Sequence, residues 1–340
     1  MAHTPGRRDL LRGAAAVGSF LAVDVAGLLA AFNWIGPSRL TPQAFLDAFN
    51  NAFGRHPGFR TNHAKGVPVA GWFDSNGNGA ELSTAAVFAP GRTPVLGRFS
   101  AAGGNPQTAD APATGRGLGL TFGFPGGEQW RTAMLNLPVF PDNSPQSMYD
   151  RLVATAVVPG TGRPDPAAMT RFYASHPPAV RAMTIIKQHP PTPGFADSIF
   201  SGLNAFYFVS RSGVRTPVRW KLIPLQQALP PSSGPDALFD PLVRQLRAGP
   251  LRWRLVLTVG TRDDPTNDAT LPWPADRRTV DAGLLTLNSV DTEATGNARD
   301  INFDPLVLPI GIEPSDDPLL SARSAVYAAS YRRRTGENTL

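Results

Sequence analysis

Short apolar runs alternate with turn-forming residues through most of the chain. From Gly66 onwards the runs are strand-like and are separated by Gly, Pro and Asn. The pattern predicts strands over residues 67–73, 85–89, 95–100, 117–124, 133–140, 204–210, 218–225 and 251–260. Many short strands at this spacing are typical of an antiparallel sheet or barrel.

Other segments carry apolar residues at helical spacing. Residues 41–53 begin with Thr-Pro and place Phe45, Leu46, Phe49 and Phe53 on one helix face. Further helices are predicted over residues 144–156, 164–175, 178–188, 235–249 and 319–334. The sequence shows no internal repeat and no long linker. We therefore predict one α+β domain, built on a barrel, over residues 37–340.

The first 36 residues resemble a targeting segment. Arg7 and Arg8 precede a weakly apolar stretch at about residues 13–31, as in a bacterial twin-arginine export signal. Asp24 lies within that stretch, where a charge is costly in a membrane-spanning helix. We expect export to the bacterial periplasm. Cleavage stays open, so the segment is either removed or kept as a membrane tether.

Composition excludes several kinds of chemistry. The 340 residues include no cysteine, which excludes disulfides, thiolate metal sites, iron–sulfur clusters and thiol nucleophiles. The formal net charge is +6, but the arginines are scattered and the only dense run is residues 332–334. We therefore expect no nucleic-acid partner.

Arg323 and Tyr327 are four residues apart on the last predicted helix and share a face. A guanidinium held against a phenol favours the phenolate form. A tyrosine phenolate is one of the few axial ligands by which proteins hold haem iron. The plainer interpretation is that such a pair only covers a helix surface.

His63 is one of five histidines, and it stands in the segment Arg60-Thr61-Asn62-His63. A lone histidine is more often structural than catalytic. The functional hypothesis makes it the acid/base of a peroxide reaction, which passes a proton from one peroxide oxygen to the other. Asn136 would then donate a hydrogen bond to the peroxide, and Ser100 would fix the imidazole tautomer.

These residues stand in five short motifs in a fixed order. The motifs are R-x-x-H-A-K-G at 60–66, R-F-S at 98–100, A-D with R-G at 109–110 and 116–117, N-x-P-x-F at 136–140, and R-x-x-x-Y at 323–327 followed by Arg334. In this order they resemble the haem catalase superfamily. The segments around them are most similar to its short branch, the catalase-related peroxidases or minicatalases. The resemblance runs from about Thr41 to Arg334.

The resemblance implies a haem-enclosing antiparallel β-barrel with surrounding helices and no C-terminal flavodoxin-like domain. It implies one haem b per chain, with Tyr327 as the axial ligand of the iron and Arg323 beside it. His63 and Asn136 would lie on the opposite side of the haem. The remaining cofactor-binding residues would be Phe140 and the propionate-neutralising Arg60, Arg98 and Arg334.

Departures from the large catalases favour peroxidase turnover, with hydrogen peroxide or an organic hydroperoxide as oxidant and a small organic electron donor. Asn62 replaces a commonly apolar residue, and residues 111–115 lack a charged pair. The long N-terminal arm is missing, which predicts a monomer or small homo-oligomer. Four alternatives stay open: a dismutating catalase, a hydroperoxide-rearranging enzyme like the allene oxide synthases, a non-catalytic haem carrier, and a barrel without a cofactor.

Overall fold

The computed structural model describes residues 40–123, 127–158, 160–294 and 296–337, so the predicted export signal at 1–36 lies outside the described residues. The helices are α2 (Pro42–Phe53), α3 (Pro145–Ala154), α4 (Pro166–Ser175), α5 (Pro177–Lys187), α6 (Phe239–Ala248) and α7 (Pro318–Glu337), with short 3-10 turns η1 (Asn78–Glu81), η2 (Ala86–Phe88) and η3 (Ala298–Asp300). The strands are β1 (Gly66–Ser75), β2 (Gly91–Ala101), β3 (Arg116–Phe122), β4 (Trp130–Leu135), β5 (Val157–Val158), β6 (Arg163–Pro164), β7 (Phe200–Ser201), β8 (Phe206–Val209), β9 (Arg215–Pro224), β10 (Leu251–Val259), β11 (Thr279–Val290) and β12 (Ile312–Pro314).

Eight of the described strands form a closed antiparallel barrel. Their order is β10, β11, β1, β2, β3, β4, β7 and β9, and β9 pairs with β10 to close the ring. β8 pairs with β9, and β12 extends the sheet from β8. Closure removes the free edges that an open sheet would expose. The predicted barrel with surrounding helices is confirmed.

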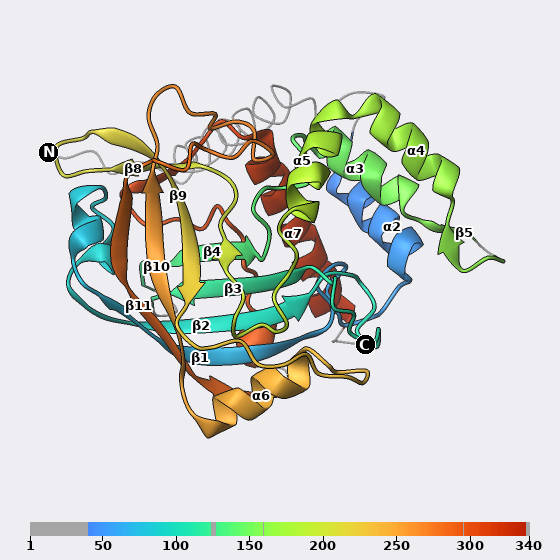
Figure 1. Ribbon diagram of the computed structural model, residues 1–340, viewed down its shortest axis with the longest axis horizontal. Coiled ribbons are helices and arrows are strands. Elements are labelled where there is room, and N and C mark those ends of the chain that lie inside the picture. Colours follow the sequence, from blue (N-terminus) through green and yellow to red (C-terminus); the bar gives the residue numbers. More distant parts are fainter. Residues whose placement is uncertain (1–39, 124–126, 159, 295, 338–340) are drawn as a thin grey trace, which may run out of the picture.

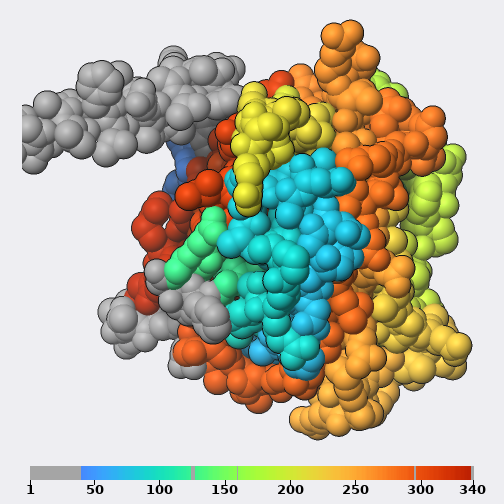
Figure 2. Space-filling model, turned by 90° about the vertical axis from the view of Figure 1, so that its left-hand side faces the viewer, coloured from blue at the N-terminus to red at the C-terminus, as the bar shows by residue number. Residues whose placement is uncertain are grey.

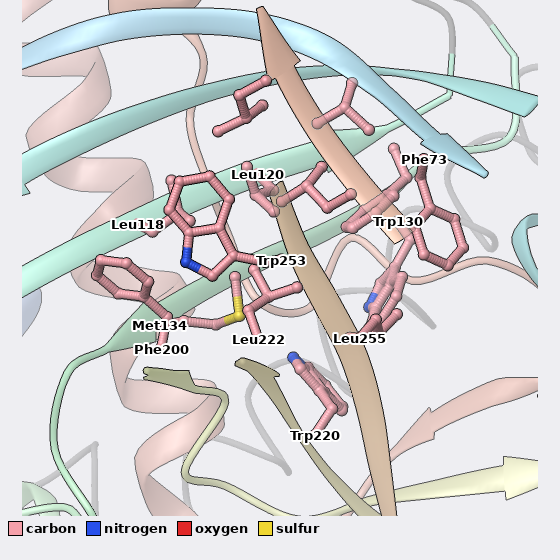
Figure 3. Packing of buried hydrophobic residues seen from close by; sticks show 14 of the residues in the cluster. Phe73, Leu118, Leu120, Trp130, Met134, Phe200, Trp220, Leu222, Trp253 and Leu255 are labelled. Carbon is pink, nitrogen blue, oxygen red and sulfur yellow. The ribbon is translucent and has the colours of Figure 1, made fainter. Parts of the chain in front are cut away.

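The interior of the barrel is filled with large apolar side chains. Figure 3 shows Trp130, Trp220 and Trp253 converging with leucines and phenylalanines from neighbouring strands. The rings of Phe122 and Trp130 stack with centroids 4.9 Å apart. Such packing leaves no room for a large cofactor inside the barrel.

One end of the barrel interior is covered by the segment that carries η1 and η2. Phe88 is fully buried, and its ring lies 5.6 Å from that of Trp130. Figure 2 shows this segment (cyan) beside the β8–β9 turn (yellow), where the Thr84 N–H donates to the Val209 carbonyl at 2.9 Å.

Helices α2, α3 and α7 pack together beside the barrel, while α6 lies against β11 on another side (Figure 1). Thr41 and Ser144 cap α2 and α3, because each side-chain oxygen accepts a hydrogen bond from a first-turn N–H. Phe45, Phe49 and Val326 belong to the apolar cluster that joins α2 to α7. None of the described helices is long and apolar enough to cross a membrane.

Several details differ from the strand predictions, including the short strands β5, β6, β7 and β12, which were not predicted. Residues 85–89 do not form a strand but contain η2, which sends Val87 and Phe88 into the core. β4 ends at Leu135, so residues 136–140 continue as a loop. β11, the longest strand, was not predicted, because Gly283 and its polar residues interrupt the apolar alternation.

Candidate active site

A cavity of about 320 Å³ lies between the outer face of strands β2–β4 and helices α2, α3 and α7. It lies outside the barrel, whereas the resemblance implied a barrel that encloses the haem. The interior is packed shut, and the open space is the layer between the barrel and the helices. All nine predicted site residues line it: Arg60, His63, Arg98, Ser100, Asn136, Phe140, Arg323, Tyr327 and Arg334.

The barrel wall of the cavity follows from the alternation of side chains along a strand. Phe99 and Leu118 point into the core, whereas their neighbours Ser100 and Gly117 line the cavity. The strand register sets Ser100 opposite Gly117 and Gly117 opposite Leu135. Asn136 follows directly after β4, so Ser100 and Asn136 lie on one patch of the barrel surface, with Gly117 on the strand between them.

His63 lies on this barrel wall, in the loop before β1. Its Nδ1 is 3.1 Å from Ser100 Oγ, and its carbonyl oxygen accepts from Arg98 Nη1 at 2.8 Å. Desolvation by burial, followed by the positive charges of Arg98, Arg60 and Arg323, lowers the pKa of His63 to about 3. The imidazole is therefore neutral at physiological pH and is able to accept a proton.

Gly117 is required behind this imidazole. A Cβ atom at position 117 would stand 2.9 Å from Ser100 Oγ and 3.1 Å from the His63 ring. Any side chain would push the histidine or the serine out of place. Sequence reasoning noted the Arg-Gly pair but assigned no role to the glycine.

Asn136 is held in one orientation by the backbone of Arg116. Its Oδ1 accepts from the Arg116 N–H at 2.7 Å, and its own N–H donates to the Arg116 carbonyl at 3.0 Å. The acceptor end of the amide is thus engaged. The donor end, Nδ2, would donate to a molecule in the cavity if the functional hypothesis is right.

Three guanidinium groups gather at one end of the cavity. Arg60 Nη2 donates to the Ile301 carbonyl at 2.8 Å, and Arg334 donates to two carbonyls of the η3 segment. Burial and the charges of Arg98 and Arg334 hold the pKa of Arg60 well below its ordinary value, and burial lowers that of Arg334 to about 10. The three positive charges repel one another, and an anionic ligand between them would be favourable because it offsets this repulsion.

Glu293 supplies one negative charge to the arginine cluster, and nothing in the sequence indicated this role. Its carboxylate accepts from Arg98 Nε at 2.7 Å and from Arg98 Nη2 at 3.1 Å. Glu293 is 195 residues from Arg98 along the chain, so no local pattern indicates the pair.

The helix wall of the cavity carries Tyr327 and Arg323. The guanidinium of Arg323 donates to Asn204 Oδ1 and, at 3.2 Å, to the Ala133 carbonyl, and it lies 5.6 Å from the centroid of the Phe140 ring. The sequence predicted that the guanidinium of Arg323 is held against the phenol of Tyr327. The hydrogen bonds recorded for Arg323 are to Asn204 and to the Ala133 carbonyl. Phe140 lies beside Arg323.

A buried carboxylate completes this network. Asp317 Oδ2 accepts from Asn204 Nδ2 at 2.7 Å, and Asp317 Oδ1 accepts from the Leu319 N–H at the start of α7. Burial raises the pKa of Asp317 to about 6, against the opposing effect of these hydrogen bonds. Asp317 precedes Pro318, a helix-start signal that was available in the sequence.

The lining fits a haem group by its chemistry. Apolar side chains supply a surface for a flat macrocycle, the arginine cluster suits two carboxylates, and the phenol offers an oxygen ligand. The apolar members are Phe49, Phe53, Leu137, Met148, Leu152 and Val326. Among the described residues no group of three or more His, Asp or Glu side chains is arranged to hold a metal ion.

Comparisons with known proteins agree with this chemistry. The family profile described as catalase matches residues 35–230. A catalase-related peroxidase of Synechococcus elongatus is 35% identical over 327 residues, which is 93% of this chain and 96% of that protein. One from Mycolicibacterium paratuberculosis is 31% identical over 304 residues, covering 87% and 96% of the two chains.

Solved structures share the fold. A fungal catalase superposes with a TM-score of 0.74 at 21% identity, over 86% of this chain and 62% of that one. Catalase A from Saccharomyces cerevisiae gives a TM-score of 0.74 at 21% identity, over 85% and 63%. This chain thus spans less than two thirds of the length of these catalases.

Proposed function

The chain belongs to the catalase family, in the branch of the catalase-related peroxidases, and we propose that it reduces peroxides at a haem held in the cavity between barrel and helices. One observation carries this proposal. A neutral histidine and an oriented asparagine amide line the same cavity as a tyrosine of α7 and three arginines.

The residues divide the work as follows. The Tyr327 phenolate would hold the iron of one haem b, and Arg60, Arg98 and Arg334 would bind its propionates, with Arg323 and Phe140 beside the ligand. When bound, haem supplies the electron-transfer chemistry that side chains lack. The protein contributes the ligand, the charge balance and the proton transfers.

His63 and Asn136 act on the peroxide. The amide Nδ2 of Asn136 donates a hydrogen bond to a peroxide oxygen and orients it. The neutral imidazole of His63 accepts a proton from one peroxide oxygen and returns it to the other oxygen, which leaves as water when the O–O bond breaks. The two electrons for this cleavage would come from bound haem. Ser100 Oγ accepts from Nδ1–H and keeps the other ring nitrogen free for this transfer.

The second half of the cycle needs two electrons. We propose a small organic donor, so that one hydrogen peroxide and one two-electron donor give two water molecules and the oxidised donor. The names of the two relatives support this choice over dismutation of two peroxides. We also propose export by the twin-arginine route and a monomer or small oligomer.

The test is an absorption spectrum of protein loaded with haem, followed by hydrogen peroxide with and without a dye donor. We expect haem binding, rapid dye oxidation and slow oxygen release. Rapid oxygen release would indicate a catalase, rearranged fatty-acid hydroperoxide an allene oxide synthase-like enzyme, and bound haem without turnover a carrier. A protein that stays colourless in the presence of abundant haem would refute the proposal.

A matched pair of variants tests the histidine. His63→Ala should slow the absorbance change after mixing with peroxide by about 10²- to 10⁴-fold while haem stays bound. His189→Ala, at an exposed site outside the cavity lining, should match the parent. Equal rates in all three proteins would remove His63 from the mechanism.

A further inference from the structure

The backbone at His63 has an unusual conformation. Its φ is 57°, in the left-handed region, and among the described residues only Leu203 is another non-glycine residue with positive φ. This region is unfavourable for a residue with a Cβ atom and persists only where the surroundings enforce it. Something must therefore hold His63 in this conformation, and with it the direction of its side chain.

The holding group is the side chain of Asn62. Its Oδ1 accepts from the His63 N–H at 3.0 Å and from the Gly103 N–H at 2.9 Å. The Ala64 N–H also donates to the Gly103 carbonyl at 3.0 Å. One amide oxygen thus joins the loop before β1 to the loop after β2.

The side-chain oxygen of Asn62 serves two backbone N–H groups at once. An apolar side chain at position 62 would leave two N–H groups without their acceptor. Arg98 holds the carbonyl of His63, and Ser100 contacts its ring. Asn62 holds the amide side of the residue, because its Oδ1 accepts from the His63 N–H.

We propose that Asn62 is a positioning residue, whose side-chain oxygen keeps His63 in the left-handed conformation from which its imidazole reaches the peroxide. The inference rests on the proposed function, because it assigns Asn62 a role that acts through the proton transfer of His63. A purely structural role would affect loop stability and leave that transfer unchanged.

The experiment compares Asn62→Leu, which keeps the branching at Cγ but loses the acceptor, with Asn62→Asp, which keeps an acceptor. Asn105→Leu is the control, because Asn105 Oδ1 accepts from the Gln107 N–H at 2.8 Å in the adjacent loop and makes no bond to His63. Each protein is loaded with haem, and the rate of the absorbance change with hydrogen peroxide is measured at pH 7.

We expect Asn62→Leu to slow this rate by about 10- to 100-fold, since small misplacements of a proton-transfer group have effects of that size. Asn62→Asp should recover most of the rate, and Asn105→Leu should match the parent. In the His63→Ala background, Asn62→Leu should produce no further slowing, because its effect passes through the histidine.

A second readout does not depend on turnover. Amide hydrogen exchange of residues 61–66 in the haem-free protein should be faster in Asn62→Leu and near the parent rate in Asn62→Asp. If Asn62→Leu does not fold, Asn62→Ala takes its place in both measurements.

The outcomes separate the two hypotheses. If His63→Ala is slow but Asn62→Leu matches the parent, the positioning role is wrong and the proposed function stands. Equal slowing by Asn62→Leu with and without His63 also refutes it. If His63→Ala reacts as fast as the parent, the proposed role of His63 is refuted, and the positioning role of Asn62 is refuted with it.

Discussion

The two faces of strands β2 and β3 differ in the kind of residue they carry, although inward and outward residues alternate along the same strands. The inward residues Phe99 and Leu118 are fully buried among apolar neighbours. The outward neighbours Ser100 and Gly117 touch an imidazole, and next to them the buried guanidinium of Arg98 binds a carboxylate. One step along the strand thus separates the packing that stabilises the fold from the groups that serve the site.

The difference shows how a rigid support is obtained for a polar site. The barrel interior contributes stability without polar groups. The outer face is then able to carry a buried histidine and several arginines whose own burial is unfavourable. Changes on the inner face should therefore affect stability, and changes on the outer face should affect the site.

The largest effect is expected on the inner face. Phe99→Ala removes a ring that packs against Phe195, Phe200 and Trp253, so the free energy of unfolding should fall by about 3–5 kcal/mol. Leu96→Ala, on the same strand but 37% exposed, should cost less than about 1 kcal/mol. Denaturant unfolding measures both, and equal losses would contradict the division between faces.

The next effect concerns pH. The pKa of His63 is about 3 in the folded protein, against an ordinary value of 6.5, so below pH 6.5 the unfolded chain binds a proton that the folded protein does not. The contribution of His63 to stability is present above pH 6.5 and is lost as the pH falls, by about 1.4 kcal/mol per unit. His63→Gln should lack this loss; unfolding curves at pH 6.5 and 4.5 that shift equally in both proteins would contradict it.

Gly117→Ala tests the outer face. The new Cβ would press on Ser100 Oγ and the His63 ring, so the reaction with peroxide should slow by about tenfold or more. Gly115→Ala is the control, since its Cβ would meet only the Ala102 methyl at an ordinary 3.5 Å. Stopped-flow mixing compares the two, and an unaffected Gly117→Ala enzyme would show that the close contact does not position the imidazole.

The smallest effect is expected from Glu293→Gln. Removing this carboxylate frees Arg98 for an anionic ligand, so haem affinity should rise a few-fold, an effect limited because Glu293 is partly exposed. The dimethyl ester of haem, which lacks free carboxylates, should show no gain. A gain with both ligands would mean that Glu293 does not act through charge.

The sequence predicted those parts of the molecule that depend on local order. Helical spacing located α2 and α7, and short motifs indicated His63, Asn136 and Tyr327, all of which line one cavity. The apolar run at 85–89 was misread as a strand because composition does not distinguish a strand from a segment that covers a barrel end.

What was missed depends on long-range contacts. Asn204 and Asp317 meet across 113 residues, and Glu293 reaches Arg98 across 195. The left-handed backbone at His63 likewise follows from a bond between two loops and is invisible in the residue types. Gly117 belongs to one of the sequence motifs, but its role depends on the His63 ring that lies beside it in the structure.

The central claim is that Tyr327 holds the iron of a haem in this cavity. The most direct test is the absorption spectrum and haem content of Tyr327→Phe, with Tyr149→Phe on α3, outside the cavity lining, as the control. We expect Tyr327→Phe to lose haem or to shift the spectrum, and Tyr149→Phe to match the parent. A Tyr327→Phe protein with full haem content and the parent spectrum would contradict the claim.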